Sequence, residues 1–588
     1  MSKRSQVCDR CRLTKRACIG GGDTCLACLR AGIECQVTVK LKRKRKPNSS
    51  LEDLGKNDDG RKIIALENRI KELESQLNED TSNDLVFCHL GRLLPGSKES
   101  IFAGSTTGDF FMRQIQNEFN EKMTHSYSFT ETASLAFRST SELHRQLNNA
   151  LDISFLNELD QVEMITSYKR DWNSLYPFLD DVTPQTILPN NELERFTTHT
   201  IYTHFMIICI QLLSNNDIAN AATLFRFLQE KYLVSLMEPP TMAVLKCYLV
   251  TMIYLQLVGN HDLCLQFNGM AVRLAFLFGL HRHSFRFNFS PAEVEFRKSY
   301  WWCVYILDLQ ISCNNGLPKL IKDEDVDTEL PIEFNKLTLQ NIEYPLPGEK
   351  AKNRGFVLLV KLFKVLNEIL ASLYTTTERR NGIPKITLLR RKLDHWKEEF
   401  LSVQEETSTE RVIILLYYSL MIHLYRPGLT FPKEVEFFQH SLQESVVSSQ
   451  KFIIQFEKIK NEVNGRVHVL YLVGFHMLFQ CSLLLQYADV LVVTSQISLP
   501  NHENSKKYIE IATRCLDEVV ETKKFGDRVS VISNCSNILK RMNEMIKEYD
   551  TKDLSVMVET GNILGSHWED QLELLFLNVT SESLNLDL

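Results

Sequence analysis

The chain has 588 residues, of which 44% are hydrophobic, and its formal net charge is −6. The charge is divided unevenly, because residues 1–46 carry a net charge of +10 and the rest of the chain carries −16. Residues 160–545 have the length and the apolar content for a large buried core. We expect no secretory signal peptide, because no apolar run follows the first residues. These properties exclude a small secreted domain and indicate a basic head joined to a large acidic body.

Six cysteines dominate the first 35 residues, and they are Cys8, Cys11, Cys18, Cys25, Cys28 and Cys35. The unit C-x2-C-x6-C occurs twice, with a six-residue loop between the copies. A C-x2-C pair places two thiolates at a spacing that suits tetrahedral zinc. Six thiolates complete two four-coordinate sites only when two of them are shared. The pattern therefore predicts two Zn²⁺ ions per chain, bridged by two sulfur atoms.

A disulfide framework is the alternative interpretation of these cysteines. It is disfavoured because no signal peptide is expected and because the other cysteines show no paired spacing. Most of them lie in apolar stretches, as buried free thiols do in a reducing compartment, and they are Cys88, Cys209, Cys247, Cys264, Cys303, Cys313, Cys481, Cys515 and Cys535.

The residues between the first cysteines resemble the zinc binuclear cluster (Zn2Cys6) of fungal transcription factors. The match lies in the Cys-Asp-x-Cys-Arg opening at residues 8–12 and in the basic run that precedes Cys18. The resemblance implies that residues 1–39 form a DNA-binding domain whose first short helix enters the major groove. It also implies that Cys8 and Cys25 supply the shared sulfurs. The excess of positive charge in this part of the chain fits a nucleic-acid partner.

Three basic residues of the first copy are candidate contacts to double-stranded DNA. The resemblance implies that Lys15 reads the guanines of a CGG-type triplet, and a cationic donor suits the N7 and O6 acceptors of guanine. We expect Arg12 and Arg16 to contact phosphates, which supply affinity and register rather than sequence specificity.

A basic segment and a linker occupy residues 40–62. The densest basic run suggests nuclear import together with phosphate contact, and it comprises Lys42, Arg43, Lys44, Arg45 and Lys46. A solvated tail is the alternative interpretation of such a run. Residues 48–60 are polar, and little core can form there.

Apolar residues in the segment 63–80 recur at steps of 3, 4, 3 and 4, and they are Ile63, Leu66, Ile70, Leu73 and Leu77. This spacing matches positions a and d of a coiled coil, and isoleucine at a with leucine at d favours a parallel dimer. Arg69 at position g can face Glu74 at position e of the partner helix. The family resemblance likewise implies a homodimer, whereas a lone amphipathic surface helix is the alternative.

Residues 81–159 are interpreted as a linker, and helix-period patterns dominate residues 160–545. Four features in this body follow one another: a helix ending in Gly-Leu-His at 271–281, an Arg-x-x-x-Trp-Trp helix at 296–308, a Gly-x-Pro turn at 316–318 and an acidic stretch at 323–331. Their order resembles the fungal-specific transcription factor domain, also called the middle homology region. The resemblance implies an all-α regulatory domain, so the expected fold class is mostly α with a small zinc cluster and a short coiled coil.

Several residues of the body invite functional interpretations that we set aside. Trp301 and Trp302 are interpreted as core residues rather than as a ligand pocket. Asp308 is expected to make a structural hydrogen bond, and the His281–His283 segment to be a helix end rather than a metal site. The apolar stretch 467–485 is interpreted as a buried core helix rather than a membrane span, because it contains polar residues.

The tail, residues 546–588, interleaves acidic and bulky apolar residues such as Trp568, Leu572 and Phe576, and residues 551–588 carry a net charge of −6. This composition is typical of an activation segment that binds coactivators. A last amphipathic helix packed on the body is the alternative.

The family resemblance, together with the charge and heptad patterns, therefore implies a sequence-specific nuclear transcription factor for RNA polymerase II that binds CGG-like half-sites as a dimer. An activator is expected, and a repressor is the alternative. An enzyme with an added zinc module is the rival class. It is disfavoured because no P-loop, Gly-x-Gly-x-x-Gly, His-Glu-x-x-His or Gly-x-Ser-x-Gly motif occurs. No membrane partner is expected, and target genes, inducer and half-site spacing cannot be read from the sequence.

Overall fold

The computed structural model describes residues 8, 9, 11, 18, 19, 24–32, 35, 36, 91–94, 101–107, 109–123, 152–179, 193–215, 217–236, 240–284, 287–332, 353–374, 382–401, 408–462, 474–493, 497, 499, 505–521 and 528–551. The chain divides into two compact units, residues 1–80 and residues 81–588, and each is described by itself. Several predicted features lie outside the described residues: the three basic DNA contacts, the basic import run, the coiled coil and the tail beyond residue 551.

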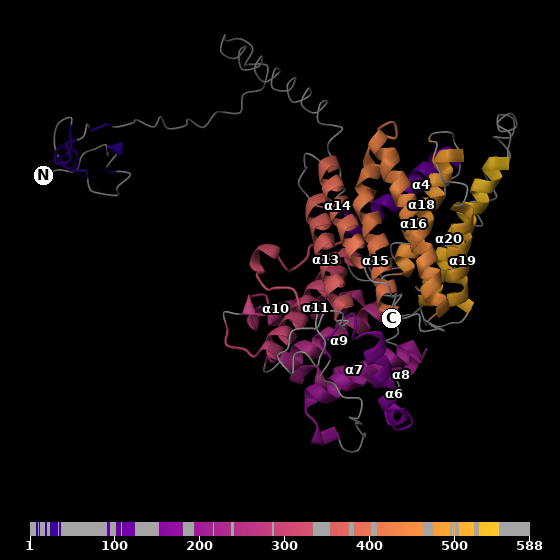
Figure 1. Cartoon of the computed structure of the whole chain (residues 1–588), viewed down its shortest axis with the longest axis horizontal. Helices are drawn as coiled ribbons and strands as arrows, with labels where there is room; N and C mark the ends of the chain where they lie inside the picture. The colour runs from indigo at the N-terminus through magenta and orange to yellow at the C-terminus, as the bar shows by residue number, and fades with distance from the viewer. Residues whose placement is uncertain are drawn as a thin grey trace, which may run out of the picture. The chain divides into compact units, whose positions relative to one another are not determined.

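The larger unit is built mainly of α-helices (Figure 1). Its first half contains α6 (Gln161–Asp171), α7 (Thr198–Ser214), α8 (Ile218–Tyr232), α9 (Met242–Val258), α10 (His261–Leu277), α11 (Pro291–Asn315), α13 (Arg354–Leu373), α14 (Gly382–Leu401) and α15 (Ser408–Tyr425). Their buried apolar residues form one continuous core, which we call the first core. The predicted all-α body is thus confirmed for this half.

The second half contains α16 (Glu436–Glu462), α18 (Phe475–Val493), α19 (Ser505–Glu521) and α20 (Arg528–Thr551). Together with α4 (Asp109–Met123) these helices enclose a separate apolar cluster, the second core. Helix α15 belongs to both cores, because Tyr417 faces the first and Ile422 the second. The remaining short 3-10 turns are η2 (Ser105–Thr107), η4 (Ser154–Asn157), η5 (Leu193–Arg195), η6 (Val234–Leu236), η8 (Asp323–Asp325) and η9 (Arg426–Thr430).

Helix α11 shows how the sequence sets the limits of a helix. Ser290 caps the N-terminus by accepting a hydrogen bond from the backbone N–H of Glu293, and Pro291 occupies the first turn, where its missing N–H costs nothing. Gly316 ends the helix with φ of 67°, a left-handed conformation that glycine adopts without a steric penalty. The predicted Gly-x-Pro turn therefore stops the helix as expected.

The segment before Asp160 differs from the prediction of a linker. Strand β1 (Gly91–Leu94) pairs antiparallel with β2 (Ile101–Gly104), and helix α4 follows. Phe111, Ile115 and Phe119 of α4 are buried in the second core. The linker interpretation was therefore wrong for residues 91–94 and 101–123. Helix α4 is stabilised by contacts with helices more than 300 positions away in the sequence, which no local pattern reveals.

The Trp-Trp helix and its neighbours are structural, as predicted. Trp301 and Trp302 are buried in the first core. Buried Asp308 accepts hydrogen bonds from the side chain of Asn268 and from the backbone N–H groups of Leu320 and Ile321, so it holds the turn after α11 in place. Its role is the structural hydrogen bonding that we expected, and no catalytic role is needed to explain its burial.

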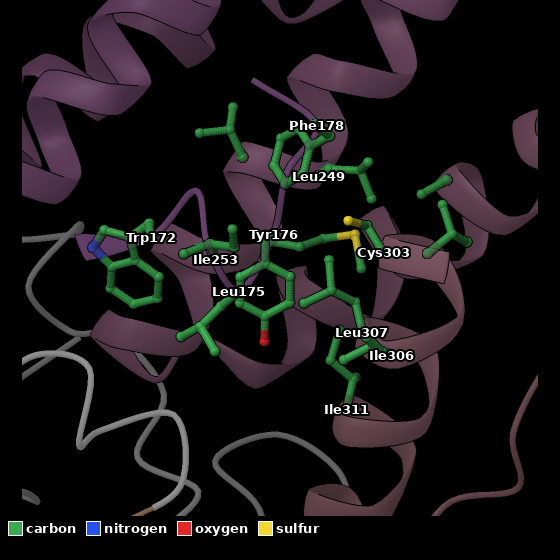
Figure 2. Close-up of a cluster of buried hydrophobic side chains, with 14 of the residues drawn as sticks. Trp172, Leu175, Tyr176, Phe178, Leu249, Ile253, Cys303, Ile306, Leu307 and Ile311 are labelled. Atoms are coloured by element: carbon green, nitrogen blue, oxygen red, sulfur yellow. The ribbon is translucent and has the colours of Figure 1, made fainter. Parts of the chain in front are cut away.

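The residues that follow α6 pack in the first core with side chains of α9 and α11. Figure 2 shows Trp172, Tyr176 and Phe178 in one cluster of buried side chains that also contains Leu249 of α9 and Cys303 of α11. The hydroxyl of Tyr176 donates to Oε1 of Gln310 at 3.0 Å, which satisfies a polar group inside an apolar cluster.

Two helical stretches, Glu410–Thr430 and Phe475–Val493, are long and apolar enough to cross a membrane by length and composition alone. Each is 83% buried inside the protein, as expected of core helices. The predicted core helix within residues 467–485 is confirmed for its described residues, which begin at Gly474.

Candidate metal centre

The six N-terminal cysteines come together in the smaller unit. Five of them are buried, and Cys35 is half-buried. The Sγ atom of Cys8 lies 3.8 Å from that of Cys25 and 3.7 Å from that of Cys28. The Sγ atoms of Cys11 and Cys25 are also 3.7 Å apart. The two copies of the C-x2-C-x6-C unit are therefore folded against each other through their sulfur atoms.

The sulfur atoms form two groups of four in which all atoms lie within 4.8 Å of one another. One group is Cys8, Cys11, Cys18 and Cys25, and the other is Cys8, Cys25, Cys28 and Cys35. Cys8 and Cys25 belong to both groups, which is the sharing that six thiolates around two ions require.

The geometry fits zinc. Zn–S bonds of about 2.3 Å at tetrahedral angles separate neighbouring sulfur atoms by about 3.8 Å. The measured distances of 3.7 and 3.8 Å match this edge length. They far exceed the length of a disulfide bond, which is about 2 Å. The disulfide interpretation is thus inconsistent with the arrangement, and the site can hold two tetrahedral zinc ions.

Local structure favours the thiolate at Cys25. This residue is the N-cap of α2 (Leu26–Leu29), and its Sγ accepts a hydrogen bond from the backbone N–H of Cys28 at 3.4 Å. That bond lowers the pKa of the Cys25 thiol to about 6, whereas burial raises the pKa of the Cys11 thiol. Bound cations would stabilise all six thiolates together, so metal binding and proton release are coupled at this site.

Backbone hydrogen bonds close the unit around the sulfurs. The N–H of Asp9 donates to the carbonyl of Gln36 at 3.0 Å, and the N–H of Leu26 donates to the carbonyl of Ile19 at 3.0 Å. Gly32, with φ of 63°, makes the turn after α2. The sequence pattern predicted the cluster of cysteines but not these backbone hydrogen bonds, because a hydrogen bond between residues distant in the sequence leaves no local signal.

Comparison with known proteins finds two known domains in the chain. Residues 6–44 match the Fungal Zn(2)-Cys(6) binuclear cluster domain, and residues 165–398 match the Fungal specific transcription factor domain. The chain therefore contains the two domains found in fungal Zn2Cys6 transcription factors, and the cluster domain binds two zinc ions. Both domains are those of transcription factors and not of enzymes.

Among the relatives, "Transcriptional activator protein acu-15" of Neurospora crassa is 24% identical over 82% of this chain and 58% of its own length. "Activator of stress genes 1" of Saccharomyces cerevisiae is 25% identical over 55% of this chain and 36% of its own length. The chain thus spans between about a third and three fifths of the length of these relatives. A solved structure, "Structure of the K. lactis CBF3 core", aligns with 81% of this chain and 97% of that chain at 12% identity and a TM-score of 0.45.

The matched regulatory domain ends at residue 398, inside α14. The first core lies mainly within the match, whereas α16 to α20 and α4 lie outside it. The second core is therefore a part of this chain that the family domain does not describe.

Proposed function

We propose that this chain activates transcription in the nucleus as a zinc-dependent homodimer that binds CGG-type triplets. The observation that carries the proposal is the pair of overlapping cysteine groups that share Cys8 and Cys25. In this proposal residues 1–39 form the DNA-binding domain, and all six cysteines are zinc ligands. When bound, zinc supplies the fixed framework that orients the first copy of the cysteine unit toward DNA.

The basic residues of the first copy divide into two roles. Lys15 reads the guanines of a triplet, and Arg12 and Arg16 contact phosphates on either side. The net charge of +10 on residues 1–46 supports this proposal, because phosphate neutralisation supplies most of the affinity of a nucleic-acid-binding protein. The basic run at residues 42–46 acts in nuclear import.

One module touches about one triplet, which carries too little information to select a site in a genome. A second module joined through the coiled coil at residues 63–80 doubles the recognised sequence and adds effective concentration. The apolar seam at Leu66 and Leu73 carries the dimer. The acidic tail, residues 546–588, recruits coactivators, and the two relatives described as activators support this assignment over repression.

Selection of bound sequences from random DNA with the full, zinc-loaded chain tests the proposal. We expect paired CGG-type triplets. Lys15→Ala should lose discrimination for the triplet by about 1–3 kcal/mol per base contact. Arg30→Ala is the matched control, since Arg30 is an exposed residue of the same unit and its loss removes the same charge. That control should weaken binding to all sequences evenly and leave base preference unchanged.

Two results would contradict the proposal. Selection without any enriched triplet would argue against sequence-specific binding. An unchanged base preference in Lys15→Ala would assign the reading role to another residue.

A variant of the apolar seam, Leu66→Glu with Leu73→Glu, tests the dimer. It should retain zinc and lose tight binding to paired triplets. If it remains dimeric, dimerisation resides in the helical body.

A further inference from the structure

A buried arginine joins the two halves of the body. Arg426 of η9 is only 5% exposed, and its side chain donates hydrogen bonds to uncharged acceptors. Its Nη1 donates to Oε1 of Gln480 at 3.2 Å, and its guanidinium lies over the ring of Tyr374 at 5.6 Å. A buried charge needs hydrogen-bond acceptors to offset the loss of water. Most of those acceptors come from a segment far away in the sequence.

The other two acceptors of Arg426 are backbone carbonyls of η2. Nη2 of Arg426 donates to the carbonyl of Ser105 at 3.2 Å and to that of Thr106 at 2.8 Å. The same turn receives a hydrogen bond at the carbonyl of Thr107 from Nε2 of Gln480 in α18, at 2.7 Å. The hydroxyl of Thr106 donates to the carbonyl of Cys313 near the end of α11, at 2.8 Å. One short turn thus bonds to η9, α18 and α11 at once.

Two glycines allow this turn to approach α11. A Cβ atom built on Gly104 would lie 1.9 Å from the carbonyl oxygen of Gly316, and a Cβ on Gly316 would lie 2.4 Å from the backbone N of Gly104. Real Cβ atoms do not approach backbone atoms this closely, so only glycine fits at either position. Gly316 also needs its left-handed φ of 67° to end α11, so it serves two purposes.

Helix α4 continues from the turn into the second core. It lies beside α18 (Figure 1), and Met112 and Phe119 are buried there. Nε2 of Gln114 donates to the carbonyl of Leu429 in η9 at 2.9 Å. The segment therefore begins at the end of α11, whose residues pack in the first core, and finishes inside the second core.

We propose that residues 101–107 and helix α4 form a clasp that couples the two cores. While the clasp is packed in place, the carbonyls of its turn accept hydrogen bonds from Arg426. The turn then also holds the end of α11, η9 and α18 in one arrangement. Displacement of the clasp leaves the buried Arg426 without two of its hydrogen-bond acceptors, so the contacts of the clasp with both cores weaken together. In the sequence, the clasp follows the N-terminal unit, residues 1–80, and precedes the other helices of both cores.

Hydrogen–deuterium exchange on the full chain tests the coupling. Gly104→Ala should speed amide exchange about tenfold or more in residues 101–123 and also in residues 423–430 and 476–484. Gly316→Ala should produce the same pattern, because it disrupts the same close contact between Gly104 and Gly316 from the other side. Gly269→Ala is the matched control, since a Cβ there meets nothing within 4 Å, and it should leave all these segments unchanged.

A milder variant distinguishes loss of the clasp contacts from unfolding of the whole chain. Thr106→Val keeps the side-chain shape and removes only the hydrogen bond to Cys313, so it should retain the helical circular dichroism signal and still speed exchange in all three segments. Faster exchange confined to residues 101–107 would overturn the coupling, because the clasp would then be a passive attachment. Unchanged exchange in residues 101–107 of both glycine variants would show that the clasp is not seated in solution.

Discussion

The N-terminal unit and the helical body differ in the interactions that stabilise them. Among the described residues of the N-terminal unit, the buried cluster consists of cysteines, with Ala27 and Cys35 packed beside them. The body instead encloses two large apolar cores. Because cysteines form the buried cluster among the described residues of the N-terminal unit, we expect metal binding to supply its folding free energy, whereas burial of apolar surface stabilises the body. The comparison teaches that one chain combines a fold that depends on metal with a fold that does not.

The largest effect is expected at a shared cysteine. Cys25→Ser removes a ligand from both groups of four, so both ions should be lost and the module should unfold, because structural zinc contributes about 10–16 kcal/mol in small zinc domains. Native mass spectrometry of the full chain gives the zinc count.

Cys18→Ser is the matched control for that experiment, because Cys18 belongs to one group only. It should weaken one ion more than the other. Equal zinc content in the Cys25→Ser variant and the wild type would contradict the shared-ligand arrangement.

A core substitution should affect the body alone. Trp301 is fully buried in the first core, and Trp301→Ala should destabilise the body by about 3–5 kcal/mol. Urea unfolding followed by circular dichroism at 222 nm measures the change. The zinc count should stay at two per chain.

The control is Leu388→Ala on α14, since the side chain of Leu388 is 55% exposed and its loss should cost less than about 0.5 kcal/mol. Loss of zinc in Trp301→Ala would show that the two parts do not fold independently.

A buried ion pair gives a smaller and more diagnostic effect. Lys298 and Glu295 are each 3% exposed and lie 2.9 Å apart, and Lys298 also contacts Glu329 at 3.1 Å. Lys298→Met leaves Glu295 buried without its cation, which should cost about 3 kcal/mol. Adding Glu295→Gln to that variant should restore much of the loss, measured by the same urea unfolding.

Arg226→Met is the surface comparison, because its pair with Glu230 is partly exposed and should contribute less than about 1 kcal/mol. If the double variant is no more stable than Lys298→Met, the buried charge is not the cause of the loss.

The parts that the sequence predicted are those governed by local patterns. The cysteine spacing predicted which sulfur atoms come together in the two groups of four, because ligand geometry is set within a few residues. The limits of α11 followed from Ser290, Pro291 and Gly316 for the same reason. The sequence did not predict the clasp, because Arg426 donates hydrogen bonds to backbone carbonyls more than 300 positions earlier in the chain. A backbone acceptor carries no sequence signature. Helix α4 was missed because its apolar face is explained only by the second core.

Removal of zinc from the full chain tests the central claim most directly. The protein is treated with a chelator, and circular dichroism at 222 nm is followed during heating, with and without the metal. We expect the helical signal and the thermal midpoint of the body to change little while the zinc is lost. Among the described residues, the groups of side chains that could hold a metal ion consist of N-terminal cysteines and include no residue of the apolar cores. A cooperative loss of helix or a large fall in the midpoint on chelation would contradict the account, since the body would then depend on the metal as the N-terminal unit does.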